Sequence, residues 1–153
     1  MQRTLIHQRV EACHETKNPT MVCRVSSGWV VLGDVQYIKG YTVLLADPIV
    51  KSINDLQGND RRAFLWEMTI IGDVLLPITG AQKINYEILG NSEEALHAHI
   101  FPRYSDEPKE YIGKPIWSYP KDLRESVPFD LKRDCSLMRK MKKHLLERGI
   151  CIE

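Results

Sequence analysis

The chain has 153 residues, a formal net charge of +1, and 43% hydrophobic and 27% charged residues. This length is typical of one domain, expected here over 1–153, and suffices to bury a core without disulfides or metals. The ordinary composition argues against a disordered chain, and the near-zero charge argues against a nucleic-acid polymer as partner. No apolar run approaches the ~20 residues of a membrane span, so no membrane partner is expected.

The cysteines and the N-terminus indicate a cytoplasmic protein. The first residues carry no apolar signal-peptide core. The four cysteines form no CxxC pair, and their spacing shows no disulfide framework. The residues expected to be reduced thiols are Cys13, Cys23, Cys135 and Cys151.

The first half of the chain reads as one helix followed by strands. A short helix is expected over Leu5–His14, and Asn18-Pro19 ends it because a residue before proline avoids the helical region. Runs rich in β-branched and aromatic residues, separated by glycine-containing turns, then predict three strands. These strands are Met21–Val25, Gly28–Leu32 and 40–46.

The second half begins with the clearest helix, capped by Asn59 or Asp60 and ended by Pro77 and Gly80. Its apolar stripe recurs at intervals of four, three and four residues. The stripe consists of Phe64, Met68, Ile71 and Leu75. Two further strands are expected at 84–89 and 96–101.

The C-terminal third is expected to be mostly loop over 104–128, because it contains four prolines. A long loop of this kind usually has a function. A last helix over 130–148, capped by Asp130, carries its apolar face on Leu131, Cys135, Met138, Met141 and Leu145. Strands joined by short turns pair antiparallel, so the pattern predicts an α+β domain.

Two histidines stand out in the strand expected at 96–101. Side chains alternate along a strand, so His97 and His99 project from the same face. The residues expected on the opposite face, packed on the helices, are Leu96, Ala98 and Ile100. Pro102 is expected to end the strand, and Arg103 then offers a guanidinium suited to phosphate or carboxylate.

Three interpretations of this pair are open from the residues alone. The two imidazoles are unremarkable residues of a half-exposed face, or they bind zinc, or they act on a phosphoryl centre. A zinc site needs a third ligand, which His7, His14, Cys23 or an acidic residue would have to supply from elsewhere in the chain. In the third interpretation, one imidazole is the nucleophile that attacks the phosphorus, and the other imidazole binds or protonates the phosphoryl group.

The context of the pair resembles the histidine triad (HIT) superfamily of nucleotide hydrolases and transferases. The segment Asn85-Tyr86-x-x-Leu89-Gly90-Asn91, followed by Leu96-His97-Ala98-His99-Ile100-Phe101-Pro102-Arg103-Tyr104, is similar to the family motif H-φ-H-φ-H-φ-φ with its trailing Pro-Arg. The similarity extends back through 29–32 and 40–45 and forward to 115–117. The resemblance implies a HIT-like fold, a five-stranded antiparallel sheet with flanking helices, and a homodimer.

The resemblance also implies roles for the two histidines. Aligned on Pro-Arg, His97 is the second triad histidine, which attacks the α-phosphorus and forms a nucleotidyl-histidine. His99 is the third, which contacts the phosphate and assists the leaving group. The first position falls on Ala95, a departure expected to loosen the orientation of His97 rather than abolish the chemistry. A group that accepts the far N–H of His97 is required, for which a backbone carbonyl would serve, and a protonated His99 would stabilise the developing charge.

The remaining candidates are expected to bind the substrate or to be ordinary turn and surface residues. They are Asn85, Asn91, Ser92, Asp34 and Arg103. In relatives the ribose-binding side chain falls at the position of Gly33, which makes the neighbouring Asp34 its substitute. Trp117 is equally compatible with the pocket and with packing.

We therefore expect hydrolysis or transfer at the α-phosphate of a nucleoside 5′-phosphate derivative, a phosphoanhydride or a phosphoramidate. The partner is a small-molecule nucleotide, and neither a cofactor nor a metal is needed. The alternative is a nucleotide-binding module with little or no turnover, because the first triad position is Ala95.

Overall fold

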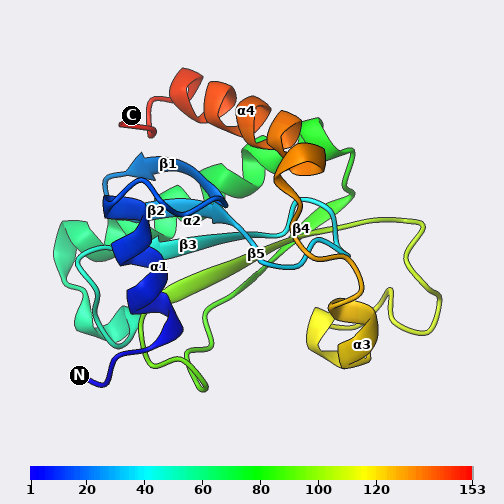
Figure 1. The fold of residues 1–153 in the computed structure, drawn as a ribbon, viewed down its shortest axis with the longest axis horizontal. Helices are drawn as coiled ribbons and strands as arrows, with labels where there is room; N and C mark the ends of the chain where they lie inside the picture. Colours follow the sequence, from blue (N-terminus) through cyan, green and yellow to red (C-terminus); the bar gives the residue numbers. More distant parts are fainter. Residues whose placement is uncertain (153) are drawn as a thin grey trace.

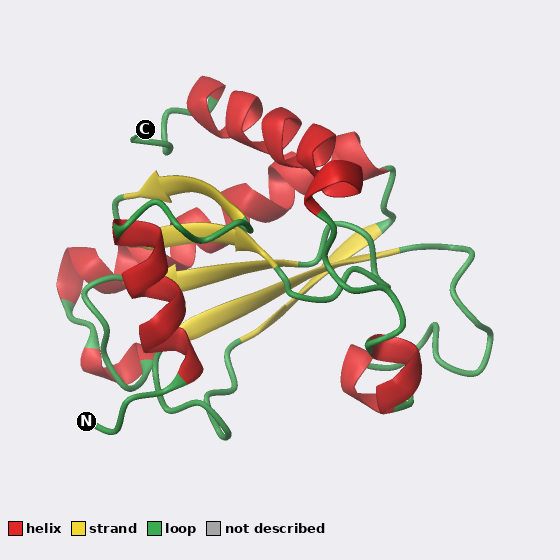
Figure 2. Cartoon of the chain, viewed as in Figure 1, coloured by secondary structure: helices red, strands yellow, loops and turns green. Residues whose placement is uncertain are grey.

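The computed structural model describes residues 1–152 and contains a five-stranded sheet flanked by helices (Figures 1 and 2). All neighbouring strands are antiparallel, as predicted. The order across the sheet is β1 (Met21–Val25), β2 (Gly28–Leu32), β3 (Thr42–Ala46), β5 (His97–Arg103) and β4 (Lys83–Glu87). The α+β class expected from the sequence is thus confirmed.

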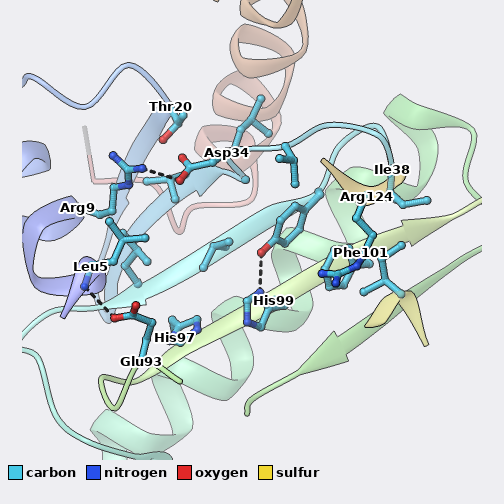
Figure 3. Close-up of a pocket in the computed structure, with 18 of the residues that line it drawn as sticks. Leu5, Arg9, Thr20, Asp34, Ile38, Glu93, His97, His99, Phe101 and Arg124 are labelled. Carbon is cyan, nitrogen blue, oxygen red and sulfur yellow. Dashed lines mark hydrogen bonds and ion pairs between the residues drawn. The ribbon is translucent and has the colours of Figure 1, made fainter. Parts of the chain in front are cut away.

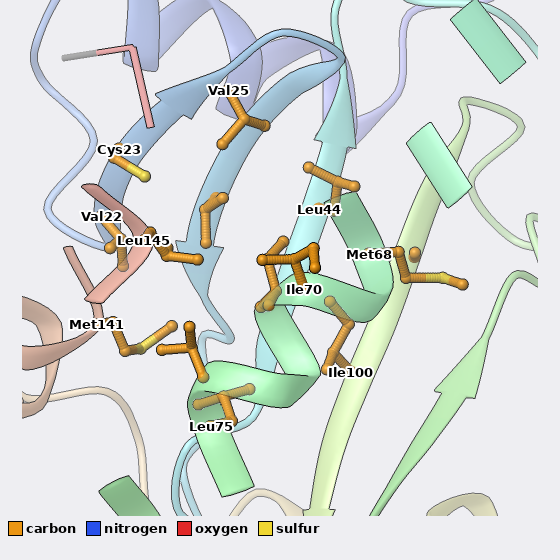
Figure 4. Packing of buried hydrophobic residues seen from close by; sticks show 14 of the residues in the cluster. Val22, Cys23, Val25, Leu44, Met68, Ile70, Leu75, Ile100, Met141 and Leu145 are labelled. Atoms are coloured by element: carbon orange, nitrogen blue, oxygen red, sulfur yellow. The ribbon is translucent and has the colours of Figure 1, made fainter. Parts of the chain in front are cut away.

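One face of the sheet is covered by two long helices, α2 (Gly58–Thr79) and α4 (Leu131–Glu147). The main core lies between them and the sheet (Figure 4). The apolar stripe of α2 belongs to this core and is therefore not available to a second copy of the chain. Its four residues, Phe64, Met68, Ile71 and Leu75, are all buried. From the sheet, Leu96, Ala98 and Ile100 join the same core, as their alternation with the histidines predicts.

The other face is only partly covered. The helix α1 (Leu5–His14) packs there through Ile6 and Val10 in a second apolar cluster. The segment between β5 and α4 returns over the same face and contains two short helical turns, η2 (Ile116–Ser118) and α3 (Lys121–Arg124). A third short turn, η1 (Ile53–Asp55), precedes α2. This incomplete cover leaves space above the central strands.

The structure corrects two predicted ends. The strand β5 continues through Pro102 to Arg103, although Pro102 was expected to stop it. The pairing of β3 with β5 ends at Ile100, so Pro102 has a strand neighbour on one side only, where a missing N–H is tolerated. The helix α2 likewise runs past Pro77, which lies in its last turn, to Thr79, and Gly80 caps it in the left-handed conformation.

Helix starts and faces also differ in detail. The N-cap of α2 is Gln57, two residues before the earliest cap expected. Asp130 caps α4 as predicted and accepts a hydrogen bond from the backbone N–H of Arg133. Of the residues expected on the apolar face of α4, Leu131 is 52% exposed and Cys135 is only partly buried, whereas Met138, Met141 and Leu145 are buried. Within the described residues, none of the helices combines the length and apolarity that crossing a membrane requires.

Candidate active site

A cavity of about 270 Å³ lies on the partly covered face of the sheet (Figure 3). Its floor is formed by side chains of the central strands, and its walls come from α1, the loop after β2 and the segment that carries η2 and α3. The lining is mainly apolar, with few polar groups, which is the usual composition of a small-molecule site. The sheet residues that form the apolar floor are Val31, Val43, Leu45 and Phe101.

His97 and His99 both line this cavity, with ring centroids 4.8 Å apart. They come from the same face of β5, as the alternation predicts. The Nδ1 of His97 lies 2.7 Å from the backbone carbonyl oxygen of Ala95. A carbonyl can only accept, so Nδ1 carries the proton and donates it. The other ring nitrogen, Nε2, is left with a free lone pair at the cavity.

This contact also explains how a chain with Ala95 orients His97. Ala95 is fully buried, and its backbone oxygen is the acceptor that a nucleophilic imidazole requires. A backbone carbonyl is supplied by any residue type. The hydrogen bond at Nδ1 that orients His97 therefore needs no histidine side chain at position 95.

His99 is held by a residue that the sequence analysis did not single out. The phenol of Tyr41 lies 2.6 Å from Nδ1 of His99, and the phenol is the better donor of the two. The proton of His99 is then on Nε2. Burial, and secondarily the neighbouring His97, lower the pKa of His99 to about 4. The expected protonated His99 is therefore wrong for neutral pH, where the structure favours a neutral donor.

The position of Tyr41 depends on a glycine nearby. A Cβ atom built on Gly33 would lie 2.1 Å from a ring carbon of Tyr41, so only glycine leaves room for this ring. Gly33 was noted in the sequence as a departure from the family pattern. In the structure it accompanies the tyrosine that contacts His99.

The depressed pKa of His99 gives a direct prediction. In the unfolded chain the imidazole titrates near its ordinary value of 6.5, and in the folded chain near 4. Between these values the unfolded state binds more protons, so stability from this group is complete above pH 6.5 and is lost as the pH falls towards 4. A titration of the histidine ring signals by NMR is expected to show a midpoint near pH 4 for His99. A midpoint above pH 6 contradicts the arrangement.

One side of the cavity combines aromatic rings with charged groups of both signs. The indole of Trp117 lies with its ring centroid 5.2 Å from His99 and 5.7 Å from Phe101, and its Nε1 donates to the carboxylate of Glu87. The guanidinium of Arg124 stacks over the indole at 5.3 Å. Trp117 thus belongs to the cavity, one of the two roles left open for it, and the long segment after β5 contributes to the site.

At the opposite side of the cavity from Arg124, two acidic side chains lie at the mouth, and each accepts a hydrogen bond from α1. Asp34 is exposed there and accepts a hydrogen bond from Arg9 at 2.5 Å (Figure 3). Glu93, also at the cavity, accepts from the backbone N–H of Leu5 at 2.8 Å, at the start of α1. Asp34 is therefore the one sequence-predicted binding residue that shares the cavity with the histidine pair.

The other predicted binding residues lie outside this cavity. Asn91 and Ser92 line a separate hollow next to the N-terminus. Asn85 and Arg103 line another, near the loop that follows β5. Arg103 is only 5% exposed, and its guanidinium donates to Glu107, to Asn85 and to backbone carbonyls. Its donors are thus occupied within the chain.

In the part of the chain that the structure describes, no third ligand completes a metal site with the two histidines. Among residues 1–152 there is no group of three or more histidine, cysteine or acidic side chains arranged to hold a metal ion. Of the candidates suggested by the sequence, His7, His14 and Cys23 are not among the residues that line the cavity, and the acidic residues that line it form no such group with the histidines. Within residues 1–152, the zinc interpretation therefore has no protein ligand set.

Comparison with known proteins bears on the fold. The sequence matches no protein-family model and no curated protein. Among solved structures, a histidine triad protein from Marinobacter aquaeolei VT8 has a TM-score of 0.72 at 20% identity, over 95% of this chain and 98% of its own. A histidine triad protein from Sinorhizobium meliloti 1021 has a TM-score of 0.69 at 21% identity, over 86% and 94%.

A structure with lower sequence identity also has a similar fold. The diadenosine triphosphate hydrolase of Plasmodium falciparum, solved in complex with cyclomarin A, has a TM-score of 0.63 at 11% identity, over 85% of this chain and 78% of its own. At such identities the similarity concerns the fold alone.

Proposed function

We propose, on the premise that this chain has the fold of histidine triad proteins, that it is a nucleotide hydrolase or transferase. The reaction takes place at the α-phosphorus of a nucleoside 5′-phosphate derivative, with His97 as the nucleophile. The observation that carries the proposal is the hydrogen bond from Nδ1 of His97 to the carbonyl of Ala95, which leaves Nε2 free at the cavity. An imidazole is nucleophilic only at a nitrogen without a proton.

In this proposal the rest of the cavity binds and orients the nucleotide. The apolar floor takes the base, and Asp34 at the mouth accepts hydrogen bonds from the ribose hydroxyls. His99 donates from Nε2 to a phosphoryl oxygen, because Tyr41 occupies its Nδ1. A fixed donor in a largely desolvated site stabilises developing charge without reorganisation.

Of the other predicted binding residues, Asn91 and Ser92 stay predictions. They directly precede Glu93, which lines the cavity. Asn85 and Arg103 have a different role in the proposal: they support the loop that carries Trp117 to the site.

The experiment that tests this function looks for the covalent intermediate. The protein is mixed with diadenosine triphosphate, quenched without acid, and measured by intact-mass spectrometry. A mass increase of one adenylyl group, mapped to His97 by peptide analysis, is the expected result. Binding of adenosine monophosphate without adduct or product supports the alternative, a binding module without turnover, for which Ala95 at the first triad position is the motivation.

A homodimer belongs to the same proposal. The strand β4 is an edge of the sheet, and the phenol of Tyr86 on it lies 3.5 Å from the carbonyl of Thr69 on α2. One turn earlier on α2, Trp66 is 63% exposed. We propose that this edge and this helix face meet their copies across a two-fold axis.

Light scattering after size-exclusion chromatography tests the dimer. The Trp66→Glu variant is expected to elute as a monomer, because a charge at the centre of an apolar interface is costly to bury. Leu146→Glu on α4, where the leucine is 49% exposed, is the matched control and keeps the dimer. A monomeric wild-type chain contradicts the proposal.

A further inference from the structure

Arg124 differs from the other arginines near the site in having no acidic partner. Arg9 pairs with Asp34, and Arg103 pairs with Glu107. Within residues 1–152 Arg124 donates only from Nε, to the carbonyl of Tyr119 at 3.1 Å, and stacks over Trp117. Its terminal nitrogens are free to donate at the cavity.

The place of Arg124 is fixed relative to the histidines. The indole below its guanidinium is in edge contact with the ring of His99. In Figure 3 Arg124 lies beside Phe101, on the other side of His99 from the pair formed by Arg9 and Asp34. A nucleoside held at Asp34 and joined through its phosphorus to His97 therefore directs its leaving group towards this second end.

A second observation concerns protons. Burial keeps the His99 ring neutral at neutral pH, and the hydrogen bond from the Tyr41 phenol to Nδ1 then places the ring N–H at Nε2, towards the cavity. A neutral imidazole N–H donates a hydrogen bond but is a poor proton donor. The site can therefore stabilise a leaving group with the positive charge of Arg124 and a hydrogen bond from His99. It offers that leaving group no acidic proton.

We propose that the Trp117–Arg124 end of the cavity binds an anionic phosphate leaving group, so that the enzyme prefers phosphoanhydrides to phosphoramidates. The inference rests on the proposed transfer of the nucleotidyl group to His97. It selects one of the two substrate classes that the proposed function leaves open.

The bonds and charges balance for such a substrate. The lone pair on Nε2 of His97 forms the N–P bond, and the P–O bond to the leaving phosphate breaks. That oxygen keeps the electron pair and leaves as a phosphate anion beside Arg124, so no proton is required. Water then forms a new P–O bond, the N–P bond breaks with its pair returning to Nε2, and the proton of water passes to solvent. A phosphoramidate instead needs a proton on its nitrogen before an amine can leave.

The test compares two substrates with the same adenosine 5′-phosphoryl group. The leaving group is adenosine diphosphate from diadenosine triphosphate and ammonia from adenosine 5′-phosphoramidate. The wild type is expected to have the higher kcat/KM for the anhydride. In Arg124→Gln the ratio of the two kcat/KM values is expected to fall about 10–100-fold, the effect of one or two charge-assisted hydrogen bonds.

Two further variants keep the test decisive. Arg124→Lys retains the charge and is expected to restore much of the ratio. Arg139→Gln, an exposed arginine on α4, is the matched control and leaves it unchanged. An equal preference in the wild type, or an unchanged ratio in Arg124→Gln with an intact fold by circular dichroism, overturns the inference while adduct formation on His97 still stands. Absence of turnover and adduct with both substrates overturns the proposed function and this inference with it.

Discussion

Replacing His97 by alanine is expected to lower kcat on the order of 10⁴-fold or more, the usual effect of removing a nucleophile. The substitution removes the imidazole whose Nε2 lone pair faces the cavity, a tautomer fixed by the hydrogen bond from Nδ1 to the carbonyl of Ala95. The Michaelis constant is expected to change little, because the base, ribose and leaving-group contacts remain. Steady-state hydrolysis of diadenosine triphosphate measures both parameters.

The control for this variant is His144→Ala. His144 lies on α4 and pairs with Glu147 at the surface, away from the cavity. It is expected to retain full activity and the adenylyl adduct. Hydrolysis by His97→Ala at the wild-type rate removes the catalytic assignment.

Replacing Glu107 by glutamine is expected to destabilise the fold by about 3–5 kcal/mol, because it leaves a buried guanidinium without its counter-charge. Glu107 is 8% exposed, and its carboxylate accepts from Nε and Nη2 of Arg103 at 3.1 and 2.9 Å. It also accepts from the backbone N–H of Tyr104 at 2.6 Å and from the phenol of Tyr119. This network holds the segment from which Trp117 and Arg124 reach the cavity, so loss of activity is expected alongside.

The pH dependence of this effect follows from the carboxyl group. Burial by itself raises the pKa of Glu107, but hydrogen bonds from Arg103, Tyr119 and the Tyr104 backbone hold it below the ordinary 4.5. A carboxyl group with a lowered pKa contributes stability that is complete above 4.5 and is lost as the pH falls through the folded value.

Urea unfolding of wild type and Glu107→Gln over a range of pH measures this. The difference in the free energy of unfolding is expected to be constant above pH 4.5 and to shrink in more acid solution. Glu110→Gln, an exposed carboxylate in the same loop, is the control and is expected to change stability little. A difference that stays constant into the acid range shows that the ion pair is not its source.

Strand alternation was sufficient to predict the local part of the site. It placed His97 and His99 on one face and Ala98 and Ile100 on the other, and the structure has them so. The need for an acceptor on the far nitrogen of His97 also followed from chemistry alone. The identity of that acceptor did not, because it depends on how the backbone at Ala95 enters β5.

Contacts between residues far apart in the sequence could not be predicted from the sequence. Tyr41 contacts His99 through the pairing of β3 with β5, a register that no local pattern specifies. Arg124 reaches the cavity because the segment after β5 folds back over the sheet, and that segment contains Glu107, the buried partner of Arg103. The same burial explains why Arg103, a plausible phosphate ligand by residue type, has its donors occupied.

The most direct measurement of the central claim is a crystal structure of the protein with an uncleaved adenosine 5′-phosphate analogue. The account predicts the α-phosphorus about 3–3.5 Å from Nε2 of His97, with the leaving oxygen on the far side in line. The base is expected over the apolar floor and the leaving group beside Arg124. An analogue bound with its phosphorus in the hollow at Asn91 and Ser92, or away from both histidines, contradicts the account.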